Sequence, residues 1–330
     1  MSEENGALLT SAARMYYLDG MGQNEIASIF GVSRSTISRL LTTARDRGIV
    51  RISVDDYNPR DHELEDRLIA RFGLRRAIVV RGIEGQATNT RRAVGYFAAP
   101  ILAKWIGAHR SIGVAGGRTI GQLVHFIEPQ AHDQHMDVVQ LMGTIGSTPS
   151  SIDASELSRT LARRFAGSFH TINAPAFMDD PKSRDLLLSH SQIRGVWGMF
   201  SSLDLILVGI GTLEDSIFAE RQVLADSELD ALRIQGAVGE ICGRFFDAYG
   251  QECRSPLRDR VIGVELQTLR QGQEVVAITT GSSRKQAIRA ALAGKLINAL
   301  VIDDSGARAV LDDTPGKRNV AAYAGTYPSG

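Results

Sequence analysis

Apolar positions in residues 23–41 recur at helical spacing on both sides of a single glycine. Ile26 and Phe30 lie four residues apart, so a helix places them on one face. Gly31 can adopt the left-handed conformation that ends a helix, and Ser33 is typical of the N-cap of the next helix. The pattern predicts a helix-turn-helix, the motif whose second helix enters the major groove of DNA.

Polar side chains occupy the outward face of the second helix, opposite its apolar face. They are donors suited to phosphates and base edges, and the candidate DNA contacts are Gln23, Ser33, Arg34, Ser35, Thr36, Ser38 and Arg39. From Ser33 to Arg51, five arginines stand against one aspartate, a local charge of +4, whereas the whole chain has 37 basic and 37 acidic residues. This confinement favours a DNA-docking surface. A helix pair that only packs or dimerises is the alternative, and it would not need this polar face.

Periodic segments on either side complete a small DNA-binding domain over residues 1–54. Residues 7–18 are amphipathic and predict a helix that covers the pair. Residues 49–54, IVRISV, alternate like a strand and indicate a wing. Residues 55–73 follow as a linker, which Pro59 keeps extended, and an amphipathic helix over 61–72.

From residue 74 to 313, short apolar runs alternate with amphipathic helical stretches. Strands are predicted at 77–80, 111–114, 137–142, 203–208, 261–264, 275–279 and 299–302. Helices are predicted at 88–106, 119–127, 154–165, 283–292 and 307–311. The alternation predicts an α/β effector domain with a Rossmann-like, mostly parallel sheet, which binds ligands beyond the carboxyl ends of its strands. Residues 314–330 have no period and many turn formers, so we predict a flexible tail.

Composition narrows the class of protein. With 330 residues, 43% of them hydrophobic, the chain can bury a large core and needs a function beyond DNA binding. It has no run of about 18 apolar residues and no signal-like start, so we expect a cytoplasmic protein without membrane partners. Cys242 and Cys253 are typical packing residues, and His132 and His135 lie in a polar segment typical of a solvated loop. No metal or other cofactor is predicted.

Glycine-bearing turns follow the predicted strands and form a candidate effector site. The first turn, residues 116–119, combines backbone N–H groups at a helix N-terminus with a guanidinium and a hydroxyl, which suits a phosphate or a polyol. It is neither a dinucleotide fingerprint nor a P-loop. The other turns offer glycines, carboxylates for sugar hydroxyls and cations for phosphate. Each turn alone has a steric or structural explanation at least as good, but four at successive strand ends favour a ligand site. The candidates are Gly116, Gly117, Arg118, Thr119, Gly209, Gly211, Glu240, Asp247, Gly281, Arg284 and Lys285.

Eight segments together resemble the SorC/DeoR-type sugar-binding transcriptional regulators, over essentially all of the chain except its tail. They are QNEIASIFGVSRSTISRLL, GVAGGRTI, VVQLMGTIG, INAPAF, DLILVGIGTL, GAVGEICGRFFDAYG, VIGVELQTLR and AITTGSSRKQAIRAALAGKLINALVIDDSGARAVL. The resemblance implies an N-terminal helix-turn-helix and an effector domain with a fold like sugar-phosphate isomerases and glucosamine-phosphate deaminases. It also implies a homodimer or homotetramer whose affinity for double-stranded operator DNA changes when a sugar, sugar alcohol or sugar phosphate binds.

The resemblance assigns the candidate residues to family motifs. Residues 116–119 correspond to the phosphate loop, Gly209 and Gly211 to a strand-end motif, and Glu240 and Asp247 to an acidic loop. Gly143, in VVQLMGTIG, is a further effector candidate. Three positions depart from the family pattern: Gly116 replaces a frequent aromatic, Thr280-Gly281 replaces a Gly-Gly pair, and Arg284 replaces a common lysine. These departures make an unphosphorylated polyol an alternative to a phosphorylated effector.

The main prediction is a transcriptional regulator of a carbohydrate-utilisation operon, and not an enzyme. The competing class is a sugar-phosphate isomerase or deaminase with a DNA-binding head, in which Glu240 or Asp247 would be the general base. No set of base, acid and nucleophile stands out for that chemistry. A purely architectural DNA binder is a third alternative, but it leaves the glycine-lined body unexplained.

Overall fold

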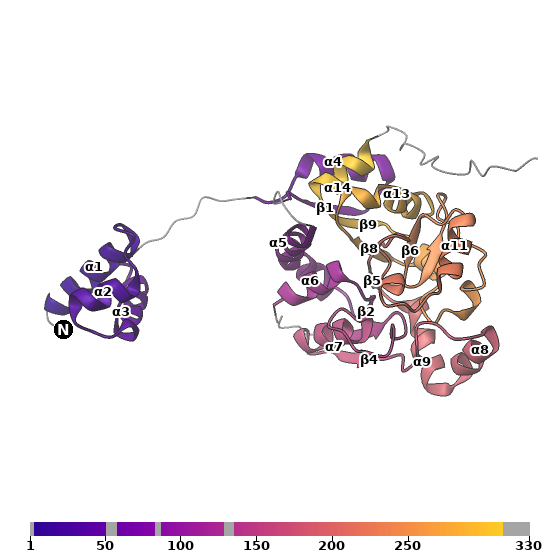
Figure 1. The fold of residues 1–330 in the computed structure, drawn as a ribbon, viewed down its shortest axis with the longest axis horizontal. Coiled ribbons are helices and arrows are strands. Elements are labelled where there is room, and N and C mark those ends of the chain that lie inside the picture. Colours follow the sequence, from indigo (N-terminus) through magenta and orange to yellow (C-terminus); the bar gives the residue numbers. More distant parts are fainter. Residues whose placement is uncertain (1–2, 51–57, 83–86, 129–134, 313–330) are drawn as a thin grey trace, which may run out of the picture. The chain divides into compact units, whose positions relative to one another are not determined.

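The computed structural model describes residues 3–50, 58–82, 87–128 and 135–312, and the chain divides into two compact units, residues 1–58 and 59–330. Within the described part of the first unit lie three helices, α1 Glu3–Tyr17, α2 Gln23–Phe30 and α3 Arg34–Asp46 (Figure 1). Their small core is entirely aliphatic where it is fully buried, and it consists of Leu9, Ala12, Ala13, Ile26, Ala27, Ile37, Leu41 and Ala44.

The turn between α2 and α3 has the predicted chemistry. Gly31 ends α2 in the left-handed region at φ 64°, and its N–H donates to carbonyls in the last turn. Ser33 caps α3, because its hydroxyl accepts a hydrogen bond from the Thr36 N–H at 3.1 Å. The predicted helix-turn-helix is confirmed. The predicted wing lies mostly outside the described residues, and its first two positions, Ile49 and Val50, form a bend rather than a strand.

The second unit is built on a seven-stranded sheet of order β1-β9-β8-β5-β2-β3-β4, in which every neighbouring pair is parallel. The strands are buried on both sides except at the edges, which explains their continuous apolar runs. In sheet order they are β1 Arg76–Val80, β9 Ala299–Asp303, β8 Glu274–Ile278, β5 Leu205–Val208, β2 Ser111–Val114, β3 Asp137–Gln140 and β4 Ser168–His170. The predicted α/β fold is confirmed.

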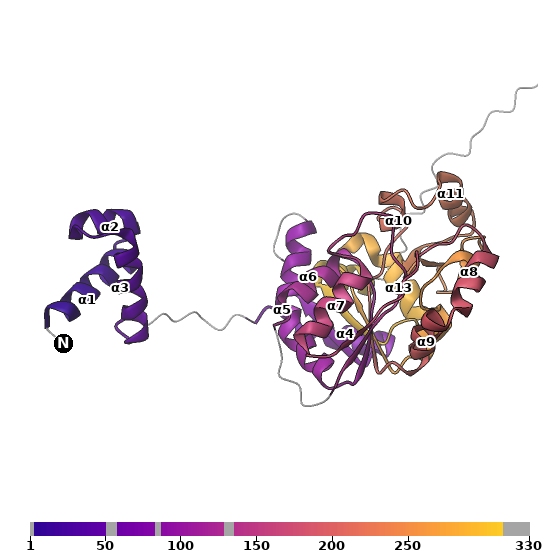
Figure 2. The ribbon, with the colours of Figure 1, turned by 90° about the horizontal axis from the view of Figure 1, so that it is seen from below.

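Two layers of helices cover this sheet. Right-handed crossovers place the helices that follow β1, β2 and β3 on one face, where α5 packs on α6 and α6 on α7 (Figure 2). These are α5 Ala87–Gly107, α6 Arg118–Phe126 and α7 Ala154–Arg164. On the other face α14 packs against both α4 and α13. The bounds of these three are α4 His62–Phe72, α13 Lys285–Ala293 and α14 Asp304–Leu311.

Shorter elements complete the second unit. A two-stranded antiparallel hairpin, β6 Gly239–Ile241 and β7 Arg244–Phe246, is separate from the main sheet. The remaining helices are α8 Pro181–Ser189, α9 Ser191–Met199, α10 Ile217–Glu220, α11 Asp226–Ile234 and α12 Leu266–Gln271, with 3-10 turns η1 Phe200–Ser202, η2 Arg258–Arg260 and η3 Ser282–Arg284. No helix in the described part of the chain is long and apolar enough to cross a membrane.

The chain enters the second unit along the edge of the sheet. Arg60 forms an antiparallel bridge with Val80 in β1, with hydrogen bonds from Asp61 N to Val79 O and from Arg81 N to Pro59 O. Asp61 then caps α4, because its side chain accepts from the Leu64 N–H. The predicted helix over 61–72 is therefore present, and Gly73 ends it at φ 66°.

One predicted strand is wrong. Residues 261–264 make only isolated bridges, Phe177 to Val261 and Met142 to Gly263, and belong to no sheet strand. Their apolar run reflects burial of a loop, since Val261, Ile262 and Val264 are all within the core. Two further elements were not predicted. Strand β4 has only three residues, all half-buried, and the β6–β7 hairpin is flanked by glycines that are typical of a loop.

Candidate functional site

A pocket of about 90 Å³ lies at the carboxyl ends of the central strands. The strand order reverses between β2 and β5, since β3 and β4 extend the sheet from β2 and β8 and β9 extend it from β5. Residues 115–120 after β2 and residues 209–211 after β5 line the pocket together. Crevices at such switch points are where open α/β sheets bind ligands.

The turn after β2 supplies backbone donors. Gly117 has φ 139°, and Arg118 begins α6 without any side-chain cap. The Gly117 N–H is already bonded to Ile152 O at 2.9 Å, whereas the N–H groups of the first helical turn have no intrahelical acceptor. A Cβ at Gly116 would lie 3.0 Å from backbone atoms of the segment that leads into α7. A larger side chain at this position would therefore push that segment away from the pocket.

The opposite wall is formed by Gly211 and Glu240. Their backbones exchange hydrogen bonds, N to O at 2.9 and 3.0 Å, which holds the β6 hairpin over the end of β5. A Cβ at Gly211 would lie 2.7 Å from the Glu240 carboxylate, so a larger residue there would require that carboxylate to move. Burial raises the pKa of Glu240 to about 7, against the lowering effect of the Gly243 N–H that donates to Oε1 at 2.5 Å. Glu240 can therefore accept or donate a hydrogen bond near neutral pH.

Three guanidinium groups converge on the pocket, from Arg91 on α5, Arg118 on α6 and Arg284 at the end of η3. Burial and then the charge of Arg118 lower the pKa values of both Arg91 and Arg284. Arg118 and Arg284 each form an ion pair with Asp215, and Arg118 also lies 3.4 Å from Glu220. The lining has three cations against Asp215 and Glu240, so it has an excess of positive charge.

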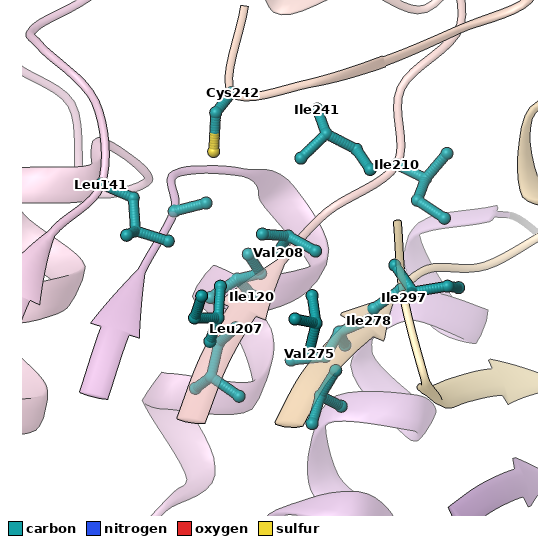
Figure 3. Close-up of a cluster of buried hydrophobic side chains, with 14 of the residues drawn as sticks. Ile120, Leu141, Leu207, Val208, Ile210, Ile241, Cys242, Val275, Ile278 and Ile297 are labelled. Atoms are coloured by element: carbon teal, nitrogen blue, oxygen red, sulfur yellow. The ribbon is translucent and has the colours of Figure 1, made fainter. Parts of the chain in front are cut away.

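The rest of the lining is apolar. Figure 3 shows Ile120, Ile210, Ile278 and Cys242 in one cluster of buried side chains around the ends of β5 and β8, and all four line the pocket. Met142 and Phe218 extend this surface. A ligand here meets both charged groups and hydrocarbon, which is typical of small-molecule sites.

Most of the predicted effector residues lie together in this pocket. Those that line it are Gly116, Gly117, Arg118, Thr119, Gly209, Gly211, Glu240 and Arg284. Glu240 belongs to strand β6, and not to a loop as predicted.

Four predicted residues are absent from the lining, and each has another role. A Cβ at Gly143 would lie 2.4 Å from Pro175 O, so this glycine permits close backbone packing. The Asp247 carboxylate accepts from the N–H groups of Tyr249 and Gln251 and closes its own turn. Gly281 has φ 91° and donates to Asp303, which shapes the loop that presents Arg284. Lys285 pairs with Asp312 at 3.5 Å.

Two residues of the site, Arg91 and Asp215, were not predicted from the sequence. Arg91 lies within a long helix, where an arginine is ordinarily a solvated surface charge, so its position in the sequence carried no signal. Asp215 lies in the segment that follows β5, four residues beyond Gly211, and its ion pairs join side chains about 70 to 100 positions away. Only the folded chain brings these charges together.

The face of α3 predicted to contact DNA is largely open to solvent. Arg34, Ser35, Ser38 and Arg39 are exposed, whereas Thr36 is half-buried. The Ser33 hydroxyl lies 2.7 Å from that of Ser35 and 2.9 Å from that of Thr36, so these hydroxyls are partly engaged in capping. Gln23 is the first residue of α2 and is half-buried.

No group of three histidine, cysteine or acidic side chains in the described residues could hold a metal ion. His135 instead lies 2.9 Å from the Ser168 hydroxyl, and His132 lies outside the described residues. Cys242 and Cys253 are both buried, as predicted for packing residues.

Comparison with known proteins supports the same division of the chain. A family model described as a sugar-binding domain matches residues 58–312, and the model of sigma-70 region 4 matches residues 14–47. The chain is 31% identical to the deoxyribonucleoside regulator of Bacillus subtilis (strain 168) over 313 residues, 95% of this chain and 100% of that one. This chain belongs to the SorC/DeoR-type family of sugar-binding transcriptional regulators.

Other members of the SorC/DeoR-type family are similar over comparable lengths. The sorbitol operon regulator of Klebsiella pneumoniae is 29% identical over 307 residues, 92% of this chain and 97% of that protein. The crystal structure of full-length SorC from Klebsiella pneumoniae aligns with a TM-score of 0.74 at 28% identity, covering 94% of this chain and all of that one. These proteins are transcriptional regulators and not enzymes, which supports the main prediction over the isomerase or deaminase alternative.

Proposed function

We propose that this regulator controls a carbohydrate-utilisation operon and that its affinity for operator DNA depends on a sugar, polyol or sugar phosphate bound in the pocket at the β2–β5 switch point. The observation that carries the proposal is the pocket lining, which combines three arginines and an uncapped helix N-terminus with a buried glutamate. The sorbitol and deoxyribonucleoside regulators among the relatives point to the same chemical class of effector.

A phosphorylated sugar fits the chemistry of the lining. Guanidinium groups bind phosphate oxygens in pairs, and helix N–H groups add donors for the same anion. Glu240, on the opposite wall, would bind a hydroxyl of the sugar. A free polyol would use Glu240 without using the positive charge, so it accounts for less of the site.

DNA binding belongs to the exposed face of α3. In this proposal Arg34, Ser38 and Arg39 contact bases and phosphates, while Ser33, Ser35 and Thr36 hold the start of the helix in place. Gln23, at the start of α2, would contact the backbone of the DNA. The protein would act in the cytoplasm on double-stranded DNA.

A chain of contacts leads from the pocket to the point where the linker enters the second unit. The Gly281 N–H, in the loop that presents Arg284, donates to Asp303 Oδ1 at 2.6 Å. Asp303 caps α14, and at the other end of this short helix Arg308 lies 3.4 Å from Asp61, the N-cap of α4. A change in the hydrogen bond from Gly281 to Asp303 on ligand binding would thus reach residues 59–61 through α14.

The effector would act by changing how two recognition helices reach their half-sites. A homodimer has two α3 helices and a homotetramer has four, and high operator affinity requires at least two of them to engage together. A ligand changes that affinity only by its differential affinity for two arrangements of the assembly, commonly about 1–3 kcal/mol.

A thermal-shift screen tests the proposal first. Purified protein would be melted with sugars, sugar alcohols and their phosphates, because a ligand that binds only the folded state raises the melting temperature. Each hit would then be added to a complex of the protein with DNA selected from a random pool. We expect a hit that also changes DNA affinity. A protein whose DNA binding responds to no carbohydrate would contradict the proposal.

A further inference from the structure

A side chain of the protein itself occupies the positively charged end of the pocket. The two oxygens of Asp215 each pair with a different arginine, Oδ1 with Arg118 and Oδ2 with Arg284. The Asp215 carbonyl accepts a further hydrogen bond from Arg118 at 3.2 Å. This is the arrangement in which two guanidinium groups would hold two oxygens of a phosphate.

Arg284 is held more firmly than the carboxylate with which it pairs. Arg284 is 12% exposed, and its guanidinium donates to Thr280 O at 2.6 Å. Asp215 is 39% exposed and lies in the loop between Gly211 and α10, where its own N–H is bonded to the Thr212 hydroxyl. The carboxylate can therefore leave while Arg284 keeps its own hydrogen bond to Thr280 O.

The site also has positive charge that Asp215 does not neutralise. Arg91 lines the same pocket, and within the described residues its only hydrogen bond runs to the Thr88 hydroxyl at 3.4 Å. It makes no ion pair there. Asp215 and the more exposed Glu220 thus serve three guanidinium groups, and an anion with more charge and more oxygens would be bound better than Asp215 is.

We propose that Asp215 is a built-in counter-ion that the phosphate or other oxyanion group of the effector displaces, and that this competition sets the selectivity of the pocket for strongly charged ligands. A phosphate monoester carries about −1.5 to −2 charge at pH 7, so it can replace a carboxylate. A neutral polyol brings no charge and leaves the Asp215 pairs intact. The inference rests on the effector pocket proposed above.

The test compares the binding of inorganic phosphate to the full-length protein and to Asp215→Asn. Glu214→Gln is the matched control. Glu214 is exposed and adjacent to Asp215 in the sequence, so its substitution removes the same charge without affecting a contact of the arginines. Calorimetry at constant ionic strength measures each dissociation constant, and sorbitol serves as a neutral probe. Because competition reduces apparent affinity, we expect Asp215→Asn to bind phosphate about tenfold more tightly than wild type, with Glu214→Gln unchanged. Adding Arg284→Ala to Asp215→Asn should abolish this gain.

Three results would overturn the inference. Equal or weaker phosphate binding by Asp215→Asn would mean that the carboxylate does not compete. An equal gain for sorbitol would mean that the loop has merely loosened. A gain that survives Arg284→Ala would place the anion elsewhere. If Arg284→Ala weakens phosphate binding in wild type while Asp215→Asn changes nothing, the anion pocket stands and only the counter-ion fails. If Arg284→Ala changes phosphate binding in no variant, the proposed pocket fails as well.

Discussion

The arginines of the two units differ in their surroundings. On α3, Arg34 and Arg39 are exposed and make no ion pair within the described residues. In the pocket, Arg284 is largely withdrawn from solvent, Arg118 is partly exposed, and the two share Asp215. Exposed guanidinium groups suit an extended polyanion such as DNA, whose binding depends strongly on salt. Guanidinium groups fixed around an internal carboxylate suit a small anion that must match them in position and charge.

Arg39→Ala should give the largest effect among the tests of this contrast between exposed and pocket arginines. We expect it to weaken operator binding by about 2–6 kcal/mol, since each half-site of a dimer loses about 1–3 kcal/mol. Fluorescence anisotropy with selected DNA at fixed salt measures the loss, and effector affinity should not change. Arg67→Ala, which removes an exposed charge on α4, is the control. A similar loss in the control, or loss of effector binding in Arg39→Ala, would contradict the assignment of the two sites to separate units.

The double variant Arg118→Ala/Arg284→Ala tests the pocket in the same way. Operator binding should survive, while affinity for a phosphorylated effector should fall by about 3–5 kcal/mol, because two hydrogen bonds to a charged group are lost. Calorimetry and anisotropy on the same preparation measure both quantities. An unchanged effector response would show that the ligand binds elsewhere.

Glu240 predicts a dependence of stability on pH. Burial raises its pKa from an ordinary value of 4.5 to about 7. Between these values the unfolded chain releases a proton that the folded chain keeps, so stability falls as pH rises and levels off above about pH 7. Denaturant melts at pH 4 and pH 8 should show Glu240→Gln gaining up to about 3 kcal/mol over wild type at pH 8 only. Glu214→Gln, exposed and equally uncharged, should show no such gain.

Arg308→Ala should have the smallest effect. We expect it to weaken the coupling between effector binding and operator binding. The Arg308 side chain is 61% exposed, so the loss of its pair with Asp61 should change the free energy of unfolding by less than about 1 kcal/mol. The change in operator affinity caused by the effector should shrink by about 0.5–2 kcal/mol while effector affinity stays constant. Anisotropy titrations with and without effector measure this change in operator affinity. An equal effect in Arg67→Ala would show that α14 does not carry the coupling between the pocket and residues 59–61.

Local patterns in the sequence predicted those elements that are determined by residues close together in the chain. Gly31 and Ser33 determine the turn of the helix-turn-helix, and apolar runs mark the buried parallel strands, so both could be predicted. The run at 261–264 misled because burial of a loop produces the same hydrophobicity as burial of a strand. The glycine turns at 116–117 and 209–211 indicated the pocket, since their positions follow from the strands. Arg91 and Asp215 could not be predicted, because only the fold brings them close to pocket residues that are far away in the sequence.

The stretch at residues 59–61 also shields an edge of the sheet. β1 is the outermost strand on its side, and bare outer strands readily pair with other chains and aggregate. Pro59 and Asp61 supply the backbone partners of Arg81 and Val79 along this rim. A recombinant fragment that starts before residue 59 would keep this cover, whereas one that starts after residue 61 would leave an apolar rim open. The choice of a starting residue over a span of three positions would thus decide whether an isolated effector domain stays monodisperse.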